Sequence, residues 1–258
     1  MTRAAPDFRV IIPARYASTR LPGKPLKDIA GLPMVVRVAR QARKSGAREV
    51  MIATDHEAIL SVAMAHGENA MLTAEYHRSG TDRLAEVINR LGVDDNEIIV
   101  NVQGDEPLVD PGLICAVALN LSEHPEAVMA TAAHPLQDDE IQWANPNIVK
   151  VVLDVQGFAL YFSRALIPYR RMDKGDPPLR HIGVYAYRAS FLRAYPSLPS
   201  CTLEEMESLE QLRALYHGYR ISVHVSKMPH APGVDTEEEL DLVRTIYQPH
   251  QSGDSFCE

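Results

Sequence analysis

Apolar and polar positions follow two different periods along the first part of the chain. Apolar runs, which predict buried strands, cover residues 9–14 (RVIIPA), 49–55 (EVMIATD) and 97–107 (EIIVNVQGDEP). Amphipathic stretches with the helical period, which predict helices, cover residues 33–46, 56–67 and 79–92. Strands that alternate with helices are typical of successive βα units around a mostly parallel sheet. The pattern therefore predicts an α/β fold.

The pattern changes after about residue 145, where strand-like segments follow one another without long helices between them. Residues 147–169 (NIVKVVLDVQGFALYFSRALIPY) predict two strands joined at Gly157, and residues 181–188 (HIGVYAYR) predict a third. We therefore expect an antiparallel or mixed extension of the sheet.

The last part of the chain returns to helical patterns. Residues 200–218 predict one continuous helix, and residues 220–226 predict a strand. A final helix is predicted over residues 235–247, with either Asp235 or Thr236 as its N-cap.

The composition indicates one large globular domain, or one domain with a small appendage. The chain has 258 residues, of which 46% are hydrophobic, and this is enough to bury a sizeable core. No segment reaches the ~20 apolar residues that a bilayer span needs, and the N-terminus lacks the apolar core of a signal peptide. The three cysteines lie far apart, which favours neither disulfides nor a zinc site. We expect a soluble protein of the reducing cytoplasm.

Charge is distributed unevenly along the chain. The net charge is -8, yet residues 1–48 contain 11 Lys and Arg residues against only Asp7 and Asp28. A basic segment inside an acidic chain indicates a local anion site or a solvated helix face. The acidic balance opposes binding to a nucleic-acid backbone, so we expect no nucleic-acid partner.

Three cations lie on one loop directly after the first predicted strand. In residues 11–26 (IIPARYASTRLPGKPL), Arg15, Arg20 and Lys24 are separated by small and polar residues. Ligands of open α/β sheets bind beyond the C-terminal ends of strands, so this loop is placed to hold a polyanion. The loop is neither a Walker A motif nor a dinucleotide fingerprint, because Lys24 is followed by Pro25 and the required glycines are absent. The alternative is a basic surface turn.

Two aspartates, Asp105 and Asp235, each have more than one possible role. Asp105 follows a buried strand, where Gly104 permits close backbone approach and Pro107 ends the ladder. A carboxylate in this position suits Mg²⁺, although a simple strand-ending turn explains the motif equally well. The residues alone favour Asp235 as a helix N-cap, because Asp-Thr before an acidic helical stretch is ordinary capping chemistry.

Eight segments together resemble one enzyme family, the 3-deoxy-manno-octulosonate cytidylyltransferases, also called CMP-Kdo synthetases. In chain order they read IPARYASTRLPGKPL, TDRLAEV, VNVQGDEP, VKVVLD, ALYFSRALIPY, LRHIGVYAYR, LEQLRAL and GVDT. The resemblance implies an α/β fold of the nucleotide-diphosphosugar-transferase type, a Rossmann-like three-layer sandwich. It also implies that residues 1–258 form a single nucleotidyltransferase domain, with a small mixed-sheet subdomain for dimerisation and sugar binding within about 145–200.

The activity that this resemblance implies is the transfer of CMP from CTP to 3-deoxy-D-manno-octulosonate (Kdo), with release of pyrophosphate, for lipopolysaccharide biosynthesis. A sugar hydroxyl attacks the α-phosphorus, and such catalysis consists mainly of positioning and charge neutralisation. The family further implies Mg²⁺ as cofactor, CTP and Kdo as small-molecule substrates, and a cytoplasmic homodimer. The aromatic, strand-like segment 158–169 suggests that apolar side chains such as Phe162 and Ile167 lie in the dimer interface.

The resemblance also assigns residues to the nucleotide and the metal. Arg15, Lys24 and Asp105 would be catalytic, and Asp105 and Asp235 would hold Mg²⁺ beside the sugar hydroxyl. The residues that would bind the nucleotide are Pro13, Ala14, Arg15, Ser18, Thr19, Arg20, Lys24, Ser79, Gly80, Thr81 and Arg83.

For the sugar, the family pattern points to Gln103, Arg164, His181, Tyr185, Glu207, Glu210 and Gln211. On one continuous helix the last three would stand at i, i+3 and i+4 and so face the same way. On a strand, His181 and Tyr185 would share one side. Arg164 would meet the sugar carboxylate, with an interface salt bridge as its alternative.

Other functions are also compatible with the sequence. The alternative acceptors are 8-amino-Kdo and a sialic-acid-like nonulosonate, although sialic-acid enzymes usually carry Lys-Asn where this chain has Lys24-Pro25. A third alternative is a non-catalytic nucleotide-binding regulator. The presence of the loop cations and of both aspartates disfavours this function, because such a regulator should have lost them. The chain departs from the commoner family pattern at Ala186, at Glu237 and in a short segment between Tyr169 and Arg180.

Overall fold

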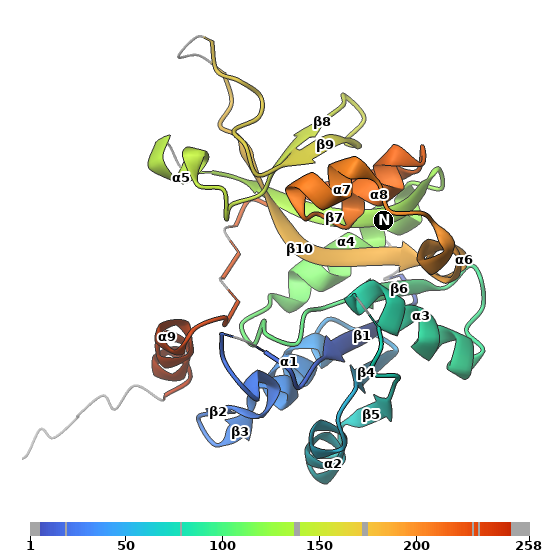
Figure 1. Ribbon diagram of the computed structural model, residues 1–258, viewed down its shortest axis with the longest axis vertical. Coiled ribbons are helices and arrows are strands. Elements are labelled where there is room, and N and C mark those ends of the chain that lie inside the picture. The colour runs from blue at the N-terminus through green and yellow to red at the C-terminus, as the bar shows by residue number, and fades with distance from the viewer. Residues whose placement is uncertain are drawn as a thin grey trace, which may run out of the picture.

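The fold is built around one mixed β-sheet, seen in the computed structural model of the chain (Figure 1). The structure describes residues 6–18, 20–77, 79–136, 140–171, 175–228, 230–231 and 233–248. The sheet has the strand order β11-β7-β10-β6-β1-β4-β5, and β8 and β9 join it beside β10. Its strands are β1 (Phe8–Ala14), β4 (Glu49–Thr54), β5 (Asn69–Leu72), β6 (Ile98–Asn101), β7 (Ala127–Pro135), β8 (Lys150–Leu153), β9 (Ala159–Ser163), β10 (Leu179–Arg188) and β11 (Arg220–Val225).

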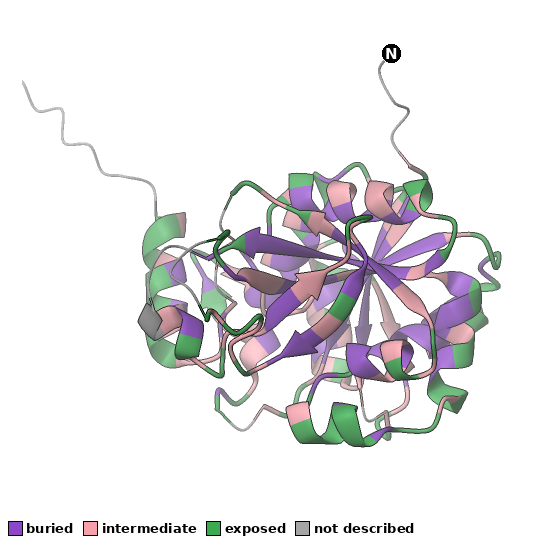
Figure 2. Cartoon of the chain, turned by 90° about the horizontal axis from the view of Figure 1, so that it is seen from above, coloured by how far each residue is buried: buried purple, intermediate pink, exposed green. Residues whose placement is uncertain are grey.

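Helices cover both faces of this sheet and make three layers. The main ones are α1 (Met34–Arg43), α2 (Glu57–Ala65), α3 (Gly80–Leu91), α4 (Pro111–Glu123) and α6 (Ala189–Ala194). The last helix, α9 (Glu237–Tyr247), packs instead in a separate cluster with Leu21, Ile29 and Met34. Val10 and Ile12 of β1 pack in the cluster that contains α1 and α4, whereas Ile11 packs in the cluster that contains α3 and α6. Because both faces are covered, β1 is apolar at nearly every position. Figure 2 shows the same layering, with buried strands between helices whose outer faces are exposed.

The first half of the sheet follows the expected βα pattern. β1 pairs in parallel with both β4 and β6, and β4 pairs in parallel with β5. The remaining short elements are β2 (Asp28–Ile29), β3 (Leu32–Pro33), α5 (Glu140–Ala144) and the 3-10 turns Lys24–Leu26 and Tyr195–Ser197. The predicted α/β fold is confirmed. None of the described helices has the length and apolar character that a membrane-spanning segment requires.

The strands predicted after residue 145 are also present, and they have two different roles. β8 and β9 form an antiparallel pair whose turn contains Gly157 at φ 87°, a backbone conformation that favours glycine. β10 pairs with β8 only at its beginning, through Leu179 and Arg180. It lies between β6 and β7 and runs antiparallel to both, so it belongs to the central sheet.

The prediction of a single helix over residues 200–218 is wrong. The segment forms two short helices, α7 (Thr202–Glu207) and α8 (Gln211–Tyr216). Ser208 separates them in the left-handed conformation, with φ 51°. The break has a tertiary cause, because the two carboxylate oxygens of Glu207 accept hydrogen bonds from Ser163, at the end of β9, and from Arg164, which follows it. Glu207 and Glu210 consequently do not lie on one continuous helix face.

The last helix, α9, begins after Thr236, which decides between the two predicted N-caps. The Thr236 side chain accepts a hydrogen bond from the backbone N–H of Glu239, and the Glu239 carboxylate accepts one from the backbone N–H of Thr236. This capping box satisfies the helix terminus without Asp235. Asp235 is therefore free for other contacts.

Candidate active site

Two adjoining cavities lie at the C-terminal ends of β1 and β6. The larger, which we call the cationic cavity, has a volume of about 440 Å³ and is lined by Arg15, Arg20, Lys24, Asp105 and Asp235. The smaller, which we call the polar cavity, has a volume of about 200 Å³ and is lined by side chains of β6, β10 and the α7–α8 junction. Gly80, Gln103 and Glu210 line both cavities, so the two cavities adjoin each other.

The cationic cavity gathers most of the residues predicted to bind the nucleotide. It brings together Pro13, Ala14, Arg15, Ser18, Arg20, Lys24, Ser79 and Gly80. The Ser79 side chain caps α3 by accepting a hydrogen bond from the backbone N–H of Asp82, at 3.1 Å. The positive N-terminal end of α3 thus faces the same cavity as the loop cations. Thr19 lies outside the described residues.

Lys24 connects the loop to both predicted metal ligands. Its Nζ lies 2.5 Å from Asp105 Oδ2 and 2.9 Å from Asp235 Oδ1. Burial by itself lowers the pKa of Lys24, but the two carboxylates outweigh it and raise the pKa above its usual value. Lys24 is therefore a protonated cation held between two anions. A simple surface turn would not make these contacts with distant parts of the chain.

The two aspartates are fixed relative to each other through the backbone. The carbonyl oxygen of Asp105 accepts a hydrogen bond from the backbone N–H of Val234, at 2.8 Å, directly before Asp235. The Lys24 ammonium already occupies a cation position between their carboxylates, so the pair suits a divalent cation. Across the described ranges no three His, Cys, Asp or Glu side chains form a metal site. Phosphate oxygens would have to supply further ligands.

Gly104 allows the Asp105 loop to approach the end of β1. A Cβ atom added at Gly104 would lie 2.8 Å from the carbonyl oxygen of Pro13, which is closer than real Cβ contacts allow. We expect Gly104→Ala to destabilise the fold by roughly 1–3 kcal/mol, as overpacking does. Thermal unfolding of the purified variant would measure this. The control is Gly31→Ala, because a Cβ atom there would lie in open space, although the backbone of Gly31 has a positive φ of 83°. If Gly104→Ala keeps wild-type stability and activity, the close approach to Pro13 does not exclude a side chain at position 104.

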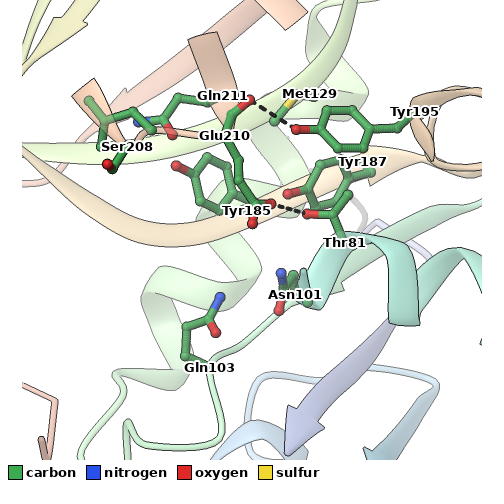
Figure 3. A pocket seen from close by; sticks show the side chains of 12 residues that line it. Thr81, Asn101, Gln103, Met129, Tyr185, Tyr187, Tyr195, Ser208, Glu210 and Gln211 are labelled. Carbon is green, nitrogen blue, oxygen red and sulfur yellow. Dashed lines mark hydrogen bonds between the residues drawn. The ribbon is translucent and has the colours of Figure 1, made fainter. Parts of the chain in front are cut away.

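The polar cavity is lined by aromatic hydroxyls, amides and one carboxylate (Figure 3). The Thr81 hydroxyl donates to Glu210 Oε2 at 3.0 Å, and the Tyr195 hydroxyl donates to the Glu210 carbonyl at 2.9 Å. Burial raises the pKa of the Glu210 carboxyl above its usual value, against the lowering effect of the Thr81 hydrogen bond. Hydrogen-bonding groups of this kind suit a polyol.

Four residues predicted for the sugar line this cavity, namely Gln103, Tyr185, Glu210 and Gln211. Thr81 also lies here, although the family pattern assigned it to the nucleotide. Asn101, Tyr187 and Tyr195 line the cavity and were not predicted. The strand period could have revealed two of them, because Asn101 lies two residues before Gln103 and Tyr187 two residues after Tyr185.

His181 lies behind this lining. Its ring packs against Phe162 and Tyr185, with ring centroids 5.1 and 5.4 Å away. Its Nε2 lies 3.0 Å from the Thr131 hydroxyl oxygen. Burial lowers the pKa of His181 to about 3, so the ring is neutral at pH 7. His181 and Tyr185 share one side of β10, as predicted, and Ile182 packs on the other.

Three other predicted residues are engaged in contacts within the chain. Glu207 accepts hydrogen bonds from the Ser163 hydroxyl at 2.6 Å and from the Arg164 backbone N–H at 2.8 Å. The Arg164 side chain donates to the carbonyl oxygens of Glu207, Pro146 and Ser208. Arg83 is fully buried and forms an ion pair with Asp55 at 2.9 Å. These three residues do not line either cavity, so any role in substrate binding is still a prediction.

Comparisons with known proteins bear on the same part of the chain. A family model described as cytidylyltransferase matches residues 9–221. The 3-deoxy-manno-octulosonate cytidylyltransferase of Acidovorax sp. (strain JS42) is 54% identical, covering 95% of this chain and 99% of the relative. The enzyme of the same name from Leptothrix cholodnii is also 54% identical, covering 93% of this chain and 91% of the relative.

A solved structure gives the same result for the fold. It is CMP:2-keto-3-deoxy-manno-octonic acid synthetase complexed with CTP, and it superposes with a TM-score of 0.87. The two sequences are 40% identical, and the match covers 93% of this chain and 98% of the other. The family resemblance and the fold predicted from the motifs are confirmed. The chain belongs to the cytidylyltransferase family and, within it, to the 3-deoxy-manno-octulosonate cytidylyltransferases.

Proposed function

We propose that this chain transfers CMP from CTP to the 2-hydroxyl of Kdo and releases pyrophosphate. The observation that carries the proposal is the junction of two unlike cavities, one cationic with two carboxylates and one polar and uncharged except for Glu210. A triphosphate suits the first cavity, and the hydroxyls of a sugar acid suit the second. The reaction needs both substrates side by side, since a sugar oxygen must attack the α-phosphorus.

Arg15 and Lys24 carry the charge neutralisation in this proposal. Arg15 lines the cationic cavity, and its buried guanidinium nitrogen Nη2 has no hydrogen-bond partner among the described residues. Such a donor can bind a phosphate oxygen without first breaking another hydrogen bond. Lys24 would leave the aspartates and contact the phosphates, where negative charge increases as pyrophosphate departs.

Asp105 and Asp235 would hold Mg²⁺ in the bound state. When bound there, Mg²⁺ would neutralise phosphate charge and lower the pKa of the sugar hydroxyl. The side chains that contact the sugar would be those of the polar cavity, above all Gln103, Glu210 and Gln211. We also propose a cytoplasmic location and a role in lipopolysaccharide biosynthesis, which would consume CMP-Kdo.

Pyrophosphate release tests the function directly. Purified protein is incubated with CTP, Mg²⁺ and one acceptor at a time, namely Kdo, 8-amino-Kdo, a sialic acid or a hexose 1-phosphate. We expect the highest kcat/KM with Kdo. Release with another acceptor and none with Kdo would overturn the proposed substrate, and no release with any acceptor would favour a nucleotide-binding regulator.

The proposed homodimer would form through the second half of the chain. β8 and β9 lie at one end of the molecule, away from α2 and β5 (Figure 1). Beside β8 is a hollow of about 660 Å³, lined by apolar residues such as Val151, Leu153 and Tyr169 together with Arg170, Arg171 and Asp176. Phe162 cannot contribute to an interface as predicted, because it is 0% exposed and packs in the core of its own chain.

Sedimentation velocity at micromolar concentration should give about twice the mass of the 28.6 kDa chain. Tyr169 is 83% exposed beside the hollow, so Tyr169→Glu should shift the population toward the monomer, because a charge in an apolar interface is costly. Tyr76 is equally exposed, at 82%, on a segment away from β8, and Tyr76→Glu is the control. A wild-type species of only 28.6 kDa would rule the dimer out under these conditions.

A further inference from the structure

Asn101 is a polar residue at the end of an otherwise apolar strand. β6 reads IIVN, and Asn101 is only 2% exposed. It pairs with Ile11 of β1 and with Tyr185 of β10, so its backbone is fixed on both sides. Figure 3 shows the Asn101 side chain in the polar cavity near Thr81, with Glu210 and Gln211 across the cavity. Asparagine is disfavoured in strands, so its presence here calls for a physical reason.

The Asn101 carboxamide is satisfied on one side only. The hydroxyl of Tyr187 interacts with both Asn101 and Thr81, and burial keeps that hydroxyl protonated by raising the pKa of Tyr187. Asn101 Oδ1, in contrast, is buried and has no hydrogen-bond partner within the described part of the chain. A buried acceptor without a partner destabilises a protein, and native structures usually provide one.

A second polar group without a partner among the described residues lines the same cavity, and it is a hydrogen-bond donor rather than an acceptor. Gln211 is 5% exposed, and its Nε2 donor also has no partner among the described residues. The cavity thus offers a buried acceptor from β6 and a buried donor from α8. A hydroxyl group both donates and accepts, so hydroxyls match these groups better than a carboxylate does.

We propose that Asn101 Oδ1 binds a hydroxyl of the sugar acid away from the reacting carbon, and that Tyr187 fixes the orientation of the carboxamide. This inference rests on the proposed function. The reacting 2-hydroxyl must lie near Asp105 and Asp235 in the cationic cavity, and Asn101 lines only the polar cavity. Asn101 therefore contributes to selecting the sugar rather than to the chemical step.

Asn101→Leu removes the acceptor and keeps a side chain of similar size. The KM for Kdo should rise by about 10-fold, since a hydrogen bond from the substrate is lost, while the KM for CTP stays unchanged. The melting temperature should not fall, because the free protein loses an unsatisfied group. A purely structural role for Asn101 predicts the reverse, with lower stability and an unchanged KM.

Asn120→Leu is the matched control, because Asn120 Oδ1 is also buried and unpartnered among the described residues but lies on α4 and lines neither cavity. It should leave both KM values unchanged. Tyr187→Phe is the second variant, should Asn101→Leu fail to fold. It keeps the ring in the core and should raise the KM for Kdo about 3-fold without affecting the KM for CTP.

A panel of Kdo analogues, each lacking one hydroxyl, separates binding from indirect effects. For the analogue that lacks the hydroxyl bound by Asn101, the wild type and Asn101→Leu should have the same KM, because the hydrogen bond to Asn101 is already absent. For the other analogues, the KM of Asn101→Leu should still be higher than that of the wild type. An equal difference with every analogue, or a KM for CTP that rises as much as that for Kdo, would overturn the role of Asn101. Wild-type protein that is inactive with Kdo would instead overturn the proposed function.

Discussion

Asp235→Asn should lower turnover by on the order of 10²–10³-fold and leave the melting temperature nearly unchanged. The amide keeps the shape of the side chain but loses the charge that would hold Mg²⁺ against the sugar hydroxyl. Stability should be preserved because Thr236, and not Asp235, caps α9. Raised Mg²⁺, or replacement by Mn²⁺, should restore part of the activity, because a weakened site can be filled by concentration or by a more tightly bound ion.

Thr236→Ala is the matched control for this experiment. It removes the side chain that accepts the Glu239 N–H, so it should cost about 1 kcal/mol of stability with little change in the turnover of the folded enzyme. The neighbouring residues thus have opposite expected phenotypes. Full activity and an unchanged Mg²⁺ dependence in Asp235→Asn would remove Asp235 from the metal site and leave Asp105 as its protein ligand.

Lys24→Ala should lower turnover by about 10²-fold or more, with a small effect on folding. The lost ammonium is the group closest to both aspartates and would contact the departing phosphates. Mg²⁺ binding in the absence of nucleotide should become stronger, because Lys24 no longer competes for the two carboxylates. Isothermal titration with Mg²⁺ measures this second effect independently of activity.

Lys27→Ala is the control for Lys24→Ala, since Lys27 lies on the same segment but pairs with Glu237 at 3.0 Å and does not line the cationic cavity. It should retain wild-type turnover and Mg²⁺ affinity. If Lys24→Ala loses its thermal stability while the folded fraction keeps full activity, Lys24 has a structural role. A pKa raised by two carboxylates is compatible with either role, so only the kinetic comparison separates them.

Local patterns were sufficient for the elements whose causes lie within a few residues. The cap at Ser79, the left-handed Gly157 and the apolar run of β1 all follow from short-range chemistry. The motif resemblance added the family and most of the cavity lining. Residues such as Lys24 and Asp105, which are 81 positions apart, were linked by the family pattern and not by any local rule.

The features that were missed have causes far away in sequence. The break at Ser208 depends on the contact between Glu207 and the Ser163–Arg164 segment, and a helical period cannot show this. The position of β10 between β6 and β7 is a matter of strand order, which periodicity does not encode. The burial of Phe162 was missed for the same reason, because it lies in one core cluster with residues far away in sequence, such as Leu84 and Leu212.

The central position of β10, between β6 and β7, affects how the acceptor range of this enzyme could be changed. Tyr185 and Tyr187 project from a strand that is hydrogen-bonded on both edges, so a substitution there disturbs three strands at once. Ser208 and Gln211, on the other wall, belong to a junction of two short helices outside the sheet. A directed-evolution library for new sugar acids is therefore better placed at the α7–α8 junction, where the backbone can adjust without loss of the sheet.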